Sequence, residues 1–133
     1  MSQENVEIVR RVFAFAGHDL DANLEFIDAD AVFDWTASRA PYSGLYRGHA
    51  EIRRFWQGFM EAWGEWTIEV QEAIEVDSET IVCATHFRAR GKGSGVVIEG
   101  HGASVWSVRD SKVIRATLFQ NRTEALEAAG LSE

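Results

Sequence analysis

The spacing of apolar residues changes once along the chain, and the change divides the sequence into a helical part and a strand part. Up to about residue 63, apolar side chains recur every three or four positions, which is the period of an amphipathic helix. From Trp66 onward they alternate with polar ones, which is the period of a half-buried strand. The pattern predicts an α+β domain in which helices come first, an antiparallel meander follows, and the helices pack on one face of the sheet.

The two helices expected first differ in length. The first has apolar residues at helical spacing, which are Val6, Val9, Val12, Phe13 and Ala16. Ser2 is available to cap its start, and Gly17 is placed to end it. The second is short, takes Asp19 or Asp21 as its cap, and ends near Asp28. Its apolar face consists of Leu20, Leu24 and Ile27.

A strand and a longer helix are expected next. Residues 31–36 form a β-rich run and predict a strand, whereas residues 37–48 indicate an irregular segment. A third helix follows from about His49 to Trp63, with Gly64 placed to end it. Its apolar stripe consists of Ile52, Phe55, Trp56, Phe59 and Trp63.

The second part predicts a meander and a final helix. Its four strands cover about residues 66–76, 80–90, 96–109 and 112–120, with turn-rich segments between them. A short helix starts after Asn121, which with Glu124 resembles a capping box, and stops at Gly130. Because long strands coil as they twist, we expect the sheet to wrap around the helices as a cone with a pocket at its open end.

Four short sequence words, in this order of elements, resemble the SnoaL-like branch of the NTF2-like superfamily. The words are His18 to Ala22, Tyr46 to Ile52, Arg90 to Gly95 and Glu124 to Leu131. The resemblance covers essentially the whole chain and implies a single domain over residues 1–133 with the NTF2-like (cystatin-like) cone. The superfamily includes polyketide cyclases, ketosteroid isomerases and binding modules, so the resemblance implies a fold and leaves the reaction open.

This chain lacks the catalytic residues of the best-known reaction among these relatives, the isomerisation of ketosteroids. Ketosteroid isomerases place a carboxylate base on the strand after the second helix, and their oxyanion hole consists of a first-helix tyrosine and a protonated acid. The resemblance puts Trp35, Phe13 and Ser104 at these positions. Asp34 lies one residue from the base position, which turns it to the opposite face. The last strand, over residues 112–120, contains no Asp or Glu for a SnoaL-type cyclase.

Candidate site residues follow if the apolar strand positions mark the inward face of the cone. The candidates for ligand binding are Trp35, Tyr46, Trp56, Trp63, Ser104, Trp106 and Gln120, with Tyr42 available in the irregular segment. Glu72 and His86 share the inward parity and are the candidates for moving a proton. For Glu72 the alternative is a bulge that returns it to solvent, or a buried salt bridge with an arginine. For His86 the alternative is a hydrogen-bonded core histidine.

Charge and composition exclude several function classes. The chain of 133 residues has 13 basic and 21 acidic residues, a net charge of −8, which disfavours nucleic acids and anionic membranes. No apolar run approaches a membrane span, and the N-terminus lacks a signal-peptide pattern, so we expect a soluble cytoplasmic protein. Cys83 is expected to be a core residue. The four histidines lack a metal-ligand spacing, so no metal or cofactor is expected.

The partner and function expected from the sequence are a second copy of the chain and a small hydrophobic molecule. Apolar residues on both faces of the last strands, with every helix on the concave side, predict a homodimer through the sheet. One function hypothesis is a cofactor-free cyclase, isomerase or dehydratase acting on a small hydrophobic cyclic substrate. The alternatives are a non-catalytic pocket for a hydrophobic ligand and a dimeric assembly module.

Overall fold

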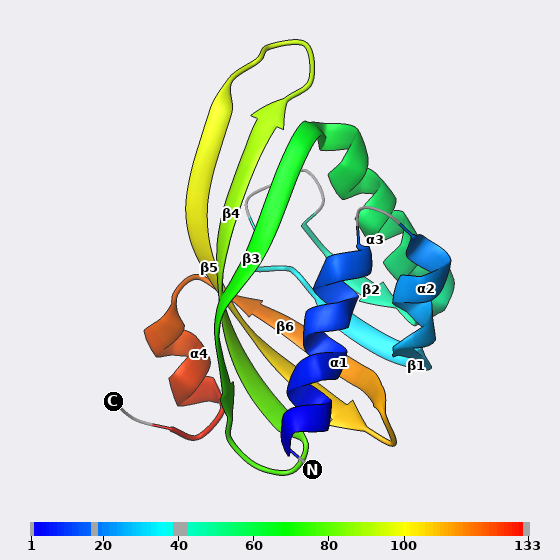
Figure 1. Ribbon diagram of the computed structural model, residues 1–133, viewed down its shortest axis with the longest axis vertical. Helices are drawn as coiled ribbons and strands as arrows, with labels where there is room; N and C mark the ends of the chain where they lie inside the picture. The colour runs from blue at the N-terminus through cyan, green and yellow to red at the C-terminus, as the bar shows by residue number, and fades with distance from the viewer. Residues whose placement is uncertain (1, 17–18, 39–42, 132–133) are drawn as a thin grey trace.

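A computed structural model describes residues 2–16, 19–38 and 43–131, with a curved sheet and four helices (Figure 1). Its elements are α1 (Ser2–Phe15), α2 (Leu20–Glu25), β1 (Ile27–Asp34), β2 (Leu45–Arg47), α3 (Gly48–Ala62), β3 (Trp63–Glu75), β4 (Thr80–Gly91), β5 (Val97–Arg109), β6 (Lys112–Phe119) and α4 (Arg122–Ala128). The predicted α+β cone is confirmed. Gly17 and Tyr42, which the sequence singled out, lie outside the described residues.

Short polar side chains start two of the helices, as the sequence predicts. The Asp19 carboxylate accepts a hydrogen bond of 3.0 Å from the backbone N–H of Ala22 at the start of α2. The Asn121 side chain accepts one of 2.9 Å from the N–H of Glu124 at the start of α4. The expectation that Ile27 extends the second helix is wrong, because Ile27 begins β1, where it is fully buried and pairs with Val113.

The sheet is mixed, with the strand order β2-β1-β6-β5-β4-β3. Strands β3 to β6 form the expected antiparallel meander, but β1 pairs with β6 in parallel. Strand β2 lies within residues 37–48, where the sequence predicts an irregular segment, and pairs antiparallel with Val32–Asp34 of β1. A strand of three residues is too short to show an alternating pattern, so the sequence contains no signal for it.

The two faces of the sheet are covered by different helices (Figure 1). Helices α1, α2 and α3 lie on the inner side, whereas α4 packs on the opposite side, where Ala125 and Leu126 contact Val82 and Ala103. The expectation that every helix lies on the concave side is therefore wrong. The apolar outer face that predicted a partner is covered in part by the chain's own last helix.

Aromatic rings fill the core between the sheet and helices α1 and α3. Phe33 of β1 meets Trp106 of β5 edge to face, with ring centroids 5.6 Å apart. Phe55 and Trp56 of α3 approach each other to 4.8 Å, and these four side chains are almost completely buried. Such large rings dominate the apolar area that the core removes from water.

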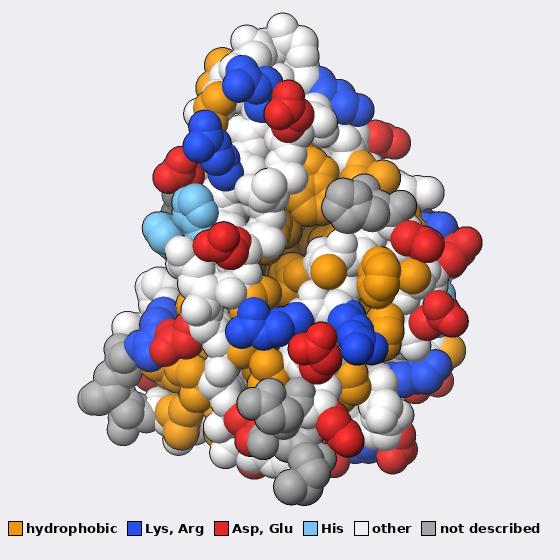
Figure 2. Space-filling model, viewed as in Figure 1, with side chains coloured by type: hydrophobic (Ala, Val, Ile, Leu, Met, Phe, Trp, Pro, Cys, Tyr) orange, Lys and Arg blue, Asp and Glu red, His pale blue; other side chains and the backbone are white. Residues whose placement is uncertain are grey.

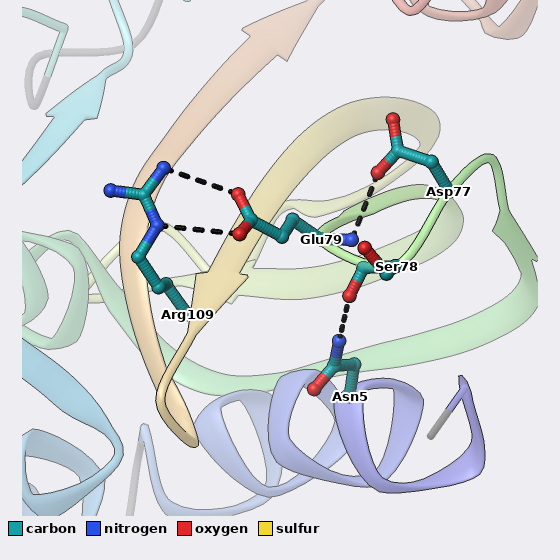
Figure 3. A network of polar contacts seen from close by, with 5 residues as sticks. All are labelled: Asn5, Asp77, Ser78, Glu79 and Arg109. Atoms are coloured by element: carbon teal, nitrogen blue, oxygen red, sulfur yellow. Dashed lines mark hydrogen bonds and ion pairs between the residues drawn. The ribbon is translucent and has the colours of Figure 1, made fainter.

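Polar contacts connect the β3–β4 connection, at one end of the sheet, to α1 and to β5 (Figure 3). The Asn5 side chain of α1 donates a hydrogen bond of 2.7 Å to the carbonyl of Ser78. Arg109 at the end of β5 forms an ion pair of 3.2 Å with Glu79. The Asp77 carboxylate accepts a hydrogen bond from the N–H of Glu79, which lowers the pKa of Asp77. This end is thereby tied to both α1 and β5.

Candidate functional site

A cavity of about 300 Å³ lies between the inner face of the sheet and the helices. Its described lining residues are Phe13, Trp35, Ser38, Phe59, Ile68, Thr85, Phe87, Gly100, His101, Gly102, Ser104, Leu118, Phe119 and Gln120. Figure 2 shows hydrophobic side chains around a hollow between the sheet and these helices. Predominantly apolar walls with a few polar groups are typical of a small-molecule site.

Strand register determines which side chains reach this cavity. Directly opposed residues of neighbouring strands point to the same side of a sheet. Phe87 of β4 is paired with Ile68 of β3 and with Gly100 of β5, and all three line the cavity. By the same register Thr85 faces inward opposite Gly102. The inward set of β4 is therefore the odd-numbered one.

Two glycines leave part of the cavity wall open. A Cβ atom added at Gly100 would meet no atom within 4 Å, so this position faces empty space. A Cβ atom added at Gly102 would lie 3.3 Å from the hydroxyl oxygen of Thr85. A larger residue at Gly100 would therefore occupy volume that a ligand could use.

A buried hydrogen bond lies at the base of the cavity. Ser104 is only 3% exposed, and its Oγ accepts a hydrogen bond of 2.8 Å from Nε1 of Trp106, which is fully buried. Buried indole N–H groups usually find such a partner. Ser104 lines the cavity, whereas Trp106 is not among the described lining residues and fixes the position of Ser104 through this hydrogen bond.

Glu72 lies outside the cavity, contrary to the expectation that it faces inward. The register of β3 shifts between Val70 and Glu72, and this bulge turns Glu72 to the outer face opposite Ala84. There its Oε1 accepts a hydrogen bond of 2.7 Å from Nε of Arg122. That hydrogen bond lowers the pKa of the Glu72 carboxyl. Of the alternative considered for this residue, the bulge that returns it to solvent is present, whereas the ion pair with an arginine is partly exposed and not buried.

His86 also lies on the outer face, so its expected inward direction is wrong. It is opposite Glu69 and His101, its Nε2 is 3.3 Å from Oε1 of Glu99, and its ring centroid is 5.1 Å from that of His101. The sequence does not show which alternate residues of β4 face inward, because this strand is apolar on both faces. Val82 is buried under α4, and Cys83 is buried under the inner helices.

Comparison with known proteins identifies the family. The model of the SnoaL-like domain matches residues 9–116. The chain belongs to the SnoaL-like family. The predicted resemblance is thereby confirmed, whereas the comparison with curated proteins gave no match.

Solved structures share the fold of this SnoaL-like domain. An NTF2-like protein from Burkholderia xenovorans LB400 is 27% identical, with a TM-score of 0.74 and 97% of each chain covered. TerC, co-crystallised with polyporic acid, is 18% identical with a TM-score of 0.75, and the match covers 96% of this chain and 98% of TerC. A protein from Mycobacterium tuberculosis in complex with estradiol-17beta-hemisuccinate is 14% identical with a TM-score of 0.76, covering 89% and 94% of the two chains.

The predicted ligand-binding residues of this SnoaL-like domain divide into two groups. Trp35, Ser104 and Gln120 line the cavity, and the Gln120 side chain donates a hydrogen bond to the carbonyl of Ala37. The others pack behind the lining residues. The ring centroids of Trp56 and Trp63 lie 6.3 and 5.7 Å from those of the lining residues Phe59 and Phe87, and the indole of Trp106 donates to Ser104. The ring of Tyr46 is 5.0 Å from that of Phe55, which is not among the described lining residues.

Some lining residues were missed at the sequence level. Phe59 lies on the apolar stripe of α3, so its spacing indicated a core position and concealed its contact with the cavity. Thr85 and Phe87 carry the parity opposite to the one expected, and only the register reveals them.

Ionisable groups are scarce at this site. Among the described lining residues, His101 is the one titratable side chain, and its ring packs against His86 on the outer face. Asp34 accepts a hydrogen bond from the Thr36 hydroxyl and lies 3.6 Å from Arg115, and both contacts lower the pKa of its carboxyl. Within the described ranges no cluster of metal-binding side chains is found, and no helix is long and apolar enough to span a bilayer.

Proposed function

We propose that this SnoaL-like domain binds a small, largely apolar molecule in the cavity between the sheet and the helices. The observation that carries the proposal is the set of five phenylalanine and tryptophan side chains among the described lining residues of a cavity of about 300 Å³, namely Phe13, Trp35, Phe59, Phe87 and Phe119. This volume is at the lower end of ordinary ligand sites, so a molecule of one or two rings fits best. The ligands named for two structural relatives, polyporic acid and estradiol-17beta-hemisuccinate, are larger ring compounds that carry acidic groups, and they support only the general expectation of a ring compound as the ligand.

Binding is favoured over proton-transfer catalysis as the function of this cavity. A cyclase, isomerase or dehydratase without a cofactor needs an acid or base within reach of its substrate. The two residues considered for that role, Glu72 and His86, are on the opposite side of the sheet. The described lining residues include no carboxylate. The one titratable side chain among the described lining residues, His101, packs against His86 on the outer face, so the lining favours ligand binding.

A substitution that fills the cavity tests the proposal. Gly100→Phe adds a ring where a side chain meets no neighbouring atom, so we expect it to abolish binding while the fold is kept. Glu99→Phe is the matched control, because Glu99 is the adjacent residue and points to the outer face beside His86. Titration with α-methylstyrene, an oxygen-free ring compound, is followed by the ¹H–¹⁵N NMR signals of Trp35 and Gly102.

The two variants distinguish a ligand bound in this cavity from a ligand bound elsewhere. Loss of the chemical-shift changes in Gly100→Phe and their retention in Glu99→Phe support a ligand in this cavity. Equal binding by Gly100→Phe and the unmodified protein would show that the ligand lies elsewhere. The absence of any binding to the unmodified protein would contradict the proposal itself.

We further propose that the protein is a cytoplasmic homodimer that contacts its partner through the sheet. Three exposed apolar side chains support the dimer, Val96 just before β5 and Val97 and Ile98 at its start, which are 59%, 41% and 39% exposed. The outer face beyond α4 is polar and includes His86 and Glu99. Sedimentation at micromolar concentration tests this proposal, and a monomer would contradict it.

A further inference from the structure

We propose that the Ser104 hydroxyl donates a hydrogen bond to an uncharged oxygen of the bound molecule, and that Trp106 sets the direction of this donation. The inference rests on the proposed function of the cavity and adds the chemical class of its ligand. That class is an apolar ring compound with a carbonyl or similar acceptor oxygen. Ser104 would be the residue that contacts the ligand, and Trp106 a positioning residue.

The hydrogen bond between these two side chains determines how the hydroxyl is used. A serine hydroxyl has one proton to donate and two lone pairs, whereas an indole N–H can only donate. Since Nε1 of Trp106 donates to Oγ of Ser104 at 2.8 Å, one lone pair is occupied. The proton of the hydroxyl is left to point away from the indole. The Ser104 proton is therefore available for donation toward the cavity.

The neighbours of Ser104 offer this proton no good acceptor. Its partners across the sheet are Cys83 of β4 and Leu118 of β6. A thiol accepts hydrogen bonds only weakly, and a leucine side chain accepts none. Among the described residues, the side-chain hydrogen bonds include none that Ser104 donates. A buried donor without a partner is costly, so a ligand oxygen placed there removes a penalty.

The charges around the cavity indicate that the acceptor oxygen is uncharged. The described lining residues include no lysine or arginine that could compensate a buried carboxylate, and the ring of the one lining histidine, His101, packs against His86 on the outer face. The chain as a whole has a net charge of −8, which adds repulsion toward anions. The aromatic lining is suited to a flat ring, and one donor serves one oxygen. A neutral carbonyl on an apolar ring meets these conditions.

A pair of ligands of nearly the same shape tests the donor. Acetophenone has a C=O group where α-methylstyrene has C=CH₂, so the ratio of their affinities isolates the hydrogen bond. We expect the ketone to bind the unmodified protein roughly five- to tenfold more tightly, the ratio given by one hydrogen bond of ordinary strength. Ser104→Ala should reduce the ratio to about one, because it removes this donor. Ser107→Ala, on the same strand but facing outward, is the matched control.

Two further variants guard against a purely structural effect. Ser104→Ala leaves the indole N–H of Trp106 unpaired, so Ser104→Ala/Trp106→Phe, which removes both partners, is measured beside it. Trp106→Phe alone keeps the serine but frees its hydroxyl to rotate, and we expect the ratio to fall only in part. A structural defect would weaken both ligands equally and leave the ratio unchanged.

The results distinguish this inference from the proposal on which it rests. A ratio that falls in Ser104→Ala and persists in Ser107→Ala supports the donor. Equal affinities of the two ligands for the unmodified protein, with both still excluded by Gly100→Phe, would overturn the donor and leave the cavity function intact. Failure of both ligands to bind would overturn both proposals.

Discussion

At the scale of single residues, burial determines what the polar atoms of this domain can do. The buried Ser104 hydroxyl accepts a hydrogen bond from the indole N–H of Trp106, which leaves its own proton available to a ligand. Cys83, on the neighbouring strand and opposite Ser104, is fully buried, and desolvation raises its pKa to about 12. A thiol in such surroundings is a packing group, because the reactive thiolate is not formed near neutral pH.

The buried thiol gives a test of how tightly the core is closed. We expect Cys83 in the folded protein to resist a thiol reagent such as Ellman's reagent at about pH 8, where an exposed cysteine reacts readily. In urea sufficient to unfold the chain, one thiol should react at once. The rate of labelling is measured from the increase in absorbance with and without urea. Rapid labelling without urea would show that the core opens locally.

At the scale of elements, turns and bulges set the register of the strands. Asp110 and Ser111 connect β5 to β6 with φ angles of +53° and +64°, the left-handed pair that a two-residue hairpin requires. The turn was predicted from these two residues. The bulge before Glu72 was weighed only as an alternative, and it reverses the facing of the residues that follow it in β3.

The hairpin turn predicts a stabilising substitution. Ser111→Gly should raise the free energy of unfolding by about 1 kcal/mol, because a left-handed conformation is strained for serine and not for glycine. Ser107→Gly, within β5 near its end, is the control, and we expect it to destabilise. Urea denaturation measures both changes. A loss of stability in Ser111→Gly would contradict the assignment of strain to this turn.

The ion pair between β3 and α4 predicts a pH dependence. The Arg122 hydrogen bond lowers the pKa of Glu72 in the folded state, so its contribution is fully present above the unfolded value of about 4.3. It is lost as the pH falls through the lowered folded-state pKa. Since both side chains are partly exposed, Glu72→Gln should cost at most about 1 kcal/mol at neutral pH.

The same variant checks the placement of Glu72. Denaturation measured from neutral to acid pH should show the two proteins converging below about pH 4. The affinity for α-methylstyrene should be unchanged, because the carboxylate lies on the outer face. A change in affinity without a change in stability would place Glu72 in the cavity after all.

At the scale of the whole molecule, the domain is three layers rather than two. The inner helices and the sheet enclose the aromatic core and the cavity, while α4 seals part of the outer face over Val82 and Ala103. Figure 1 shows α4 and α1 on opposite sides of the sheet. The apolar area left to a second copy is correspondingly smaller than the sequence predicts.

The outer layer can be tested through Leu126, which is 4% exposed. Leu126→Ala should lower the free energy of unfolding by about 2–4 kcal/mol, because it empties the contact with Val82 and Ala103. The exposed Leu45, replaced by alanine, is the control and should change stability by less than about 0.5 kcal/mol. A small effect at Leu126 would mean that α4 is only loosely attached, which thermal denaturation would show.

Much of the fold could be predicted because its signals are local. The caps Asp19 and Asn121 and the Asp110-Ser111 turn lie where short polar residues were expected. Trp35 and Ser104, which the sequence assigns to the inward face, line the cavity. Strand β2 and the parallel pairing of β1 with β6 were missed, because pairing between distant segments leaves no mark in either one.

The amino-acid sequence by itself determined the order of helices and strands, the caps and turns, and an aromatic interior, because periodicity and short-range hydrogen bonds depend on neighbouring residues. Only the tertiary structure decided which face of β3 and β4 meets the cavity. The bulge in β3 turns Glu72 to the outer face. In β4, α4 buries the apolar outer residue Val82, so apolar character does not mark the inner face, and the register places His86 outside and Thr85 and Phe87 inside. Both effects come from non-local packing, which alternation along a strand apolar on both faces cannot reveal.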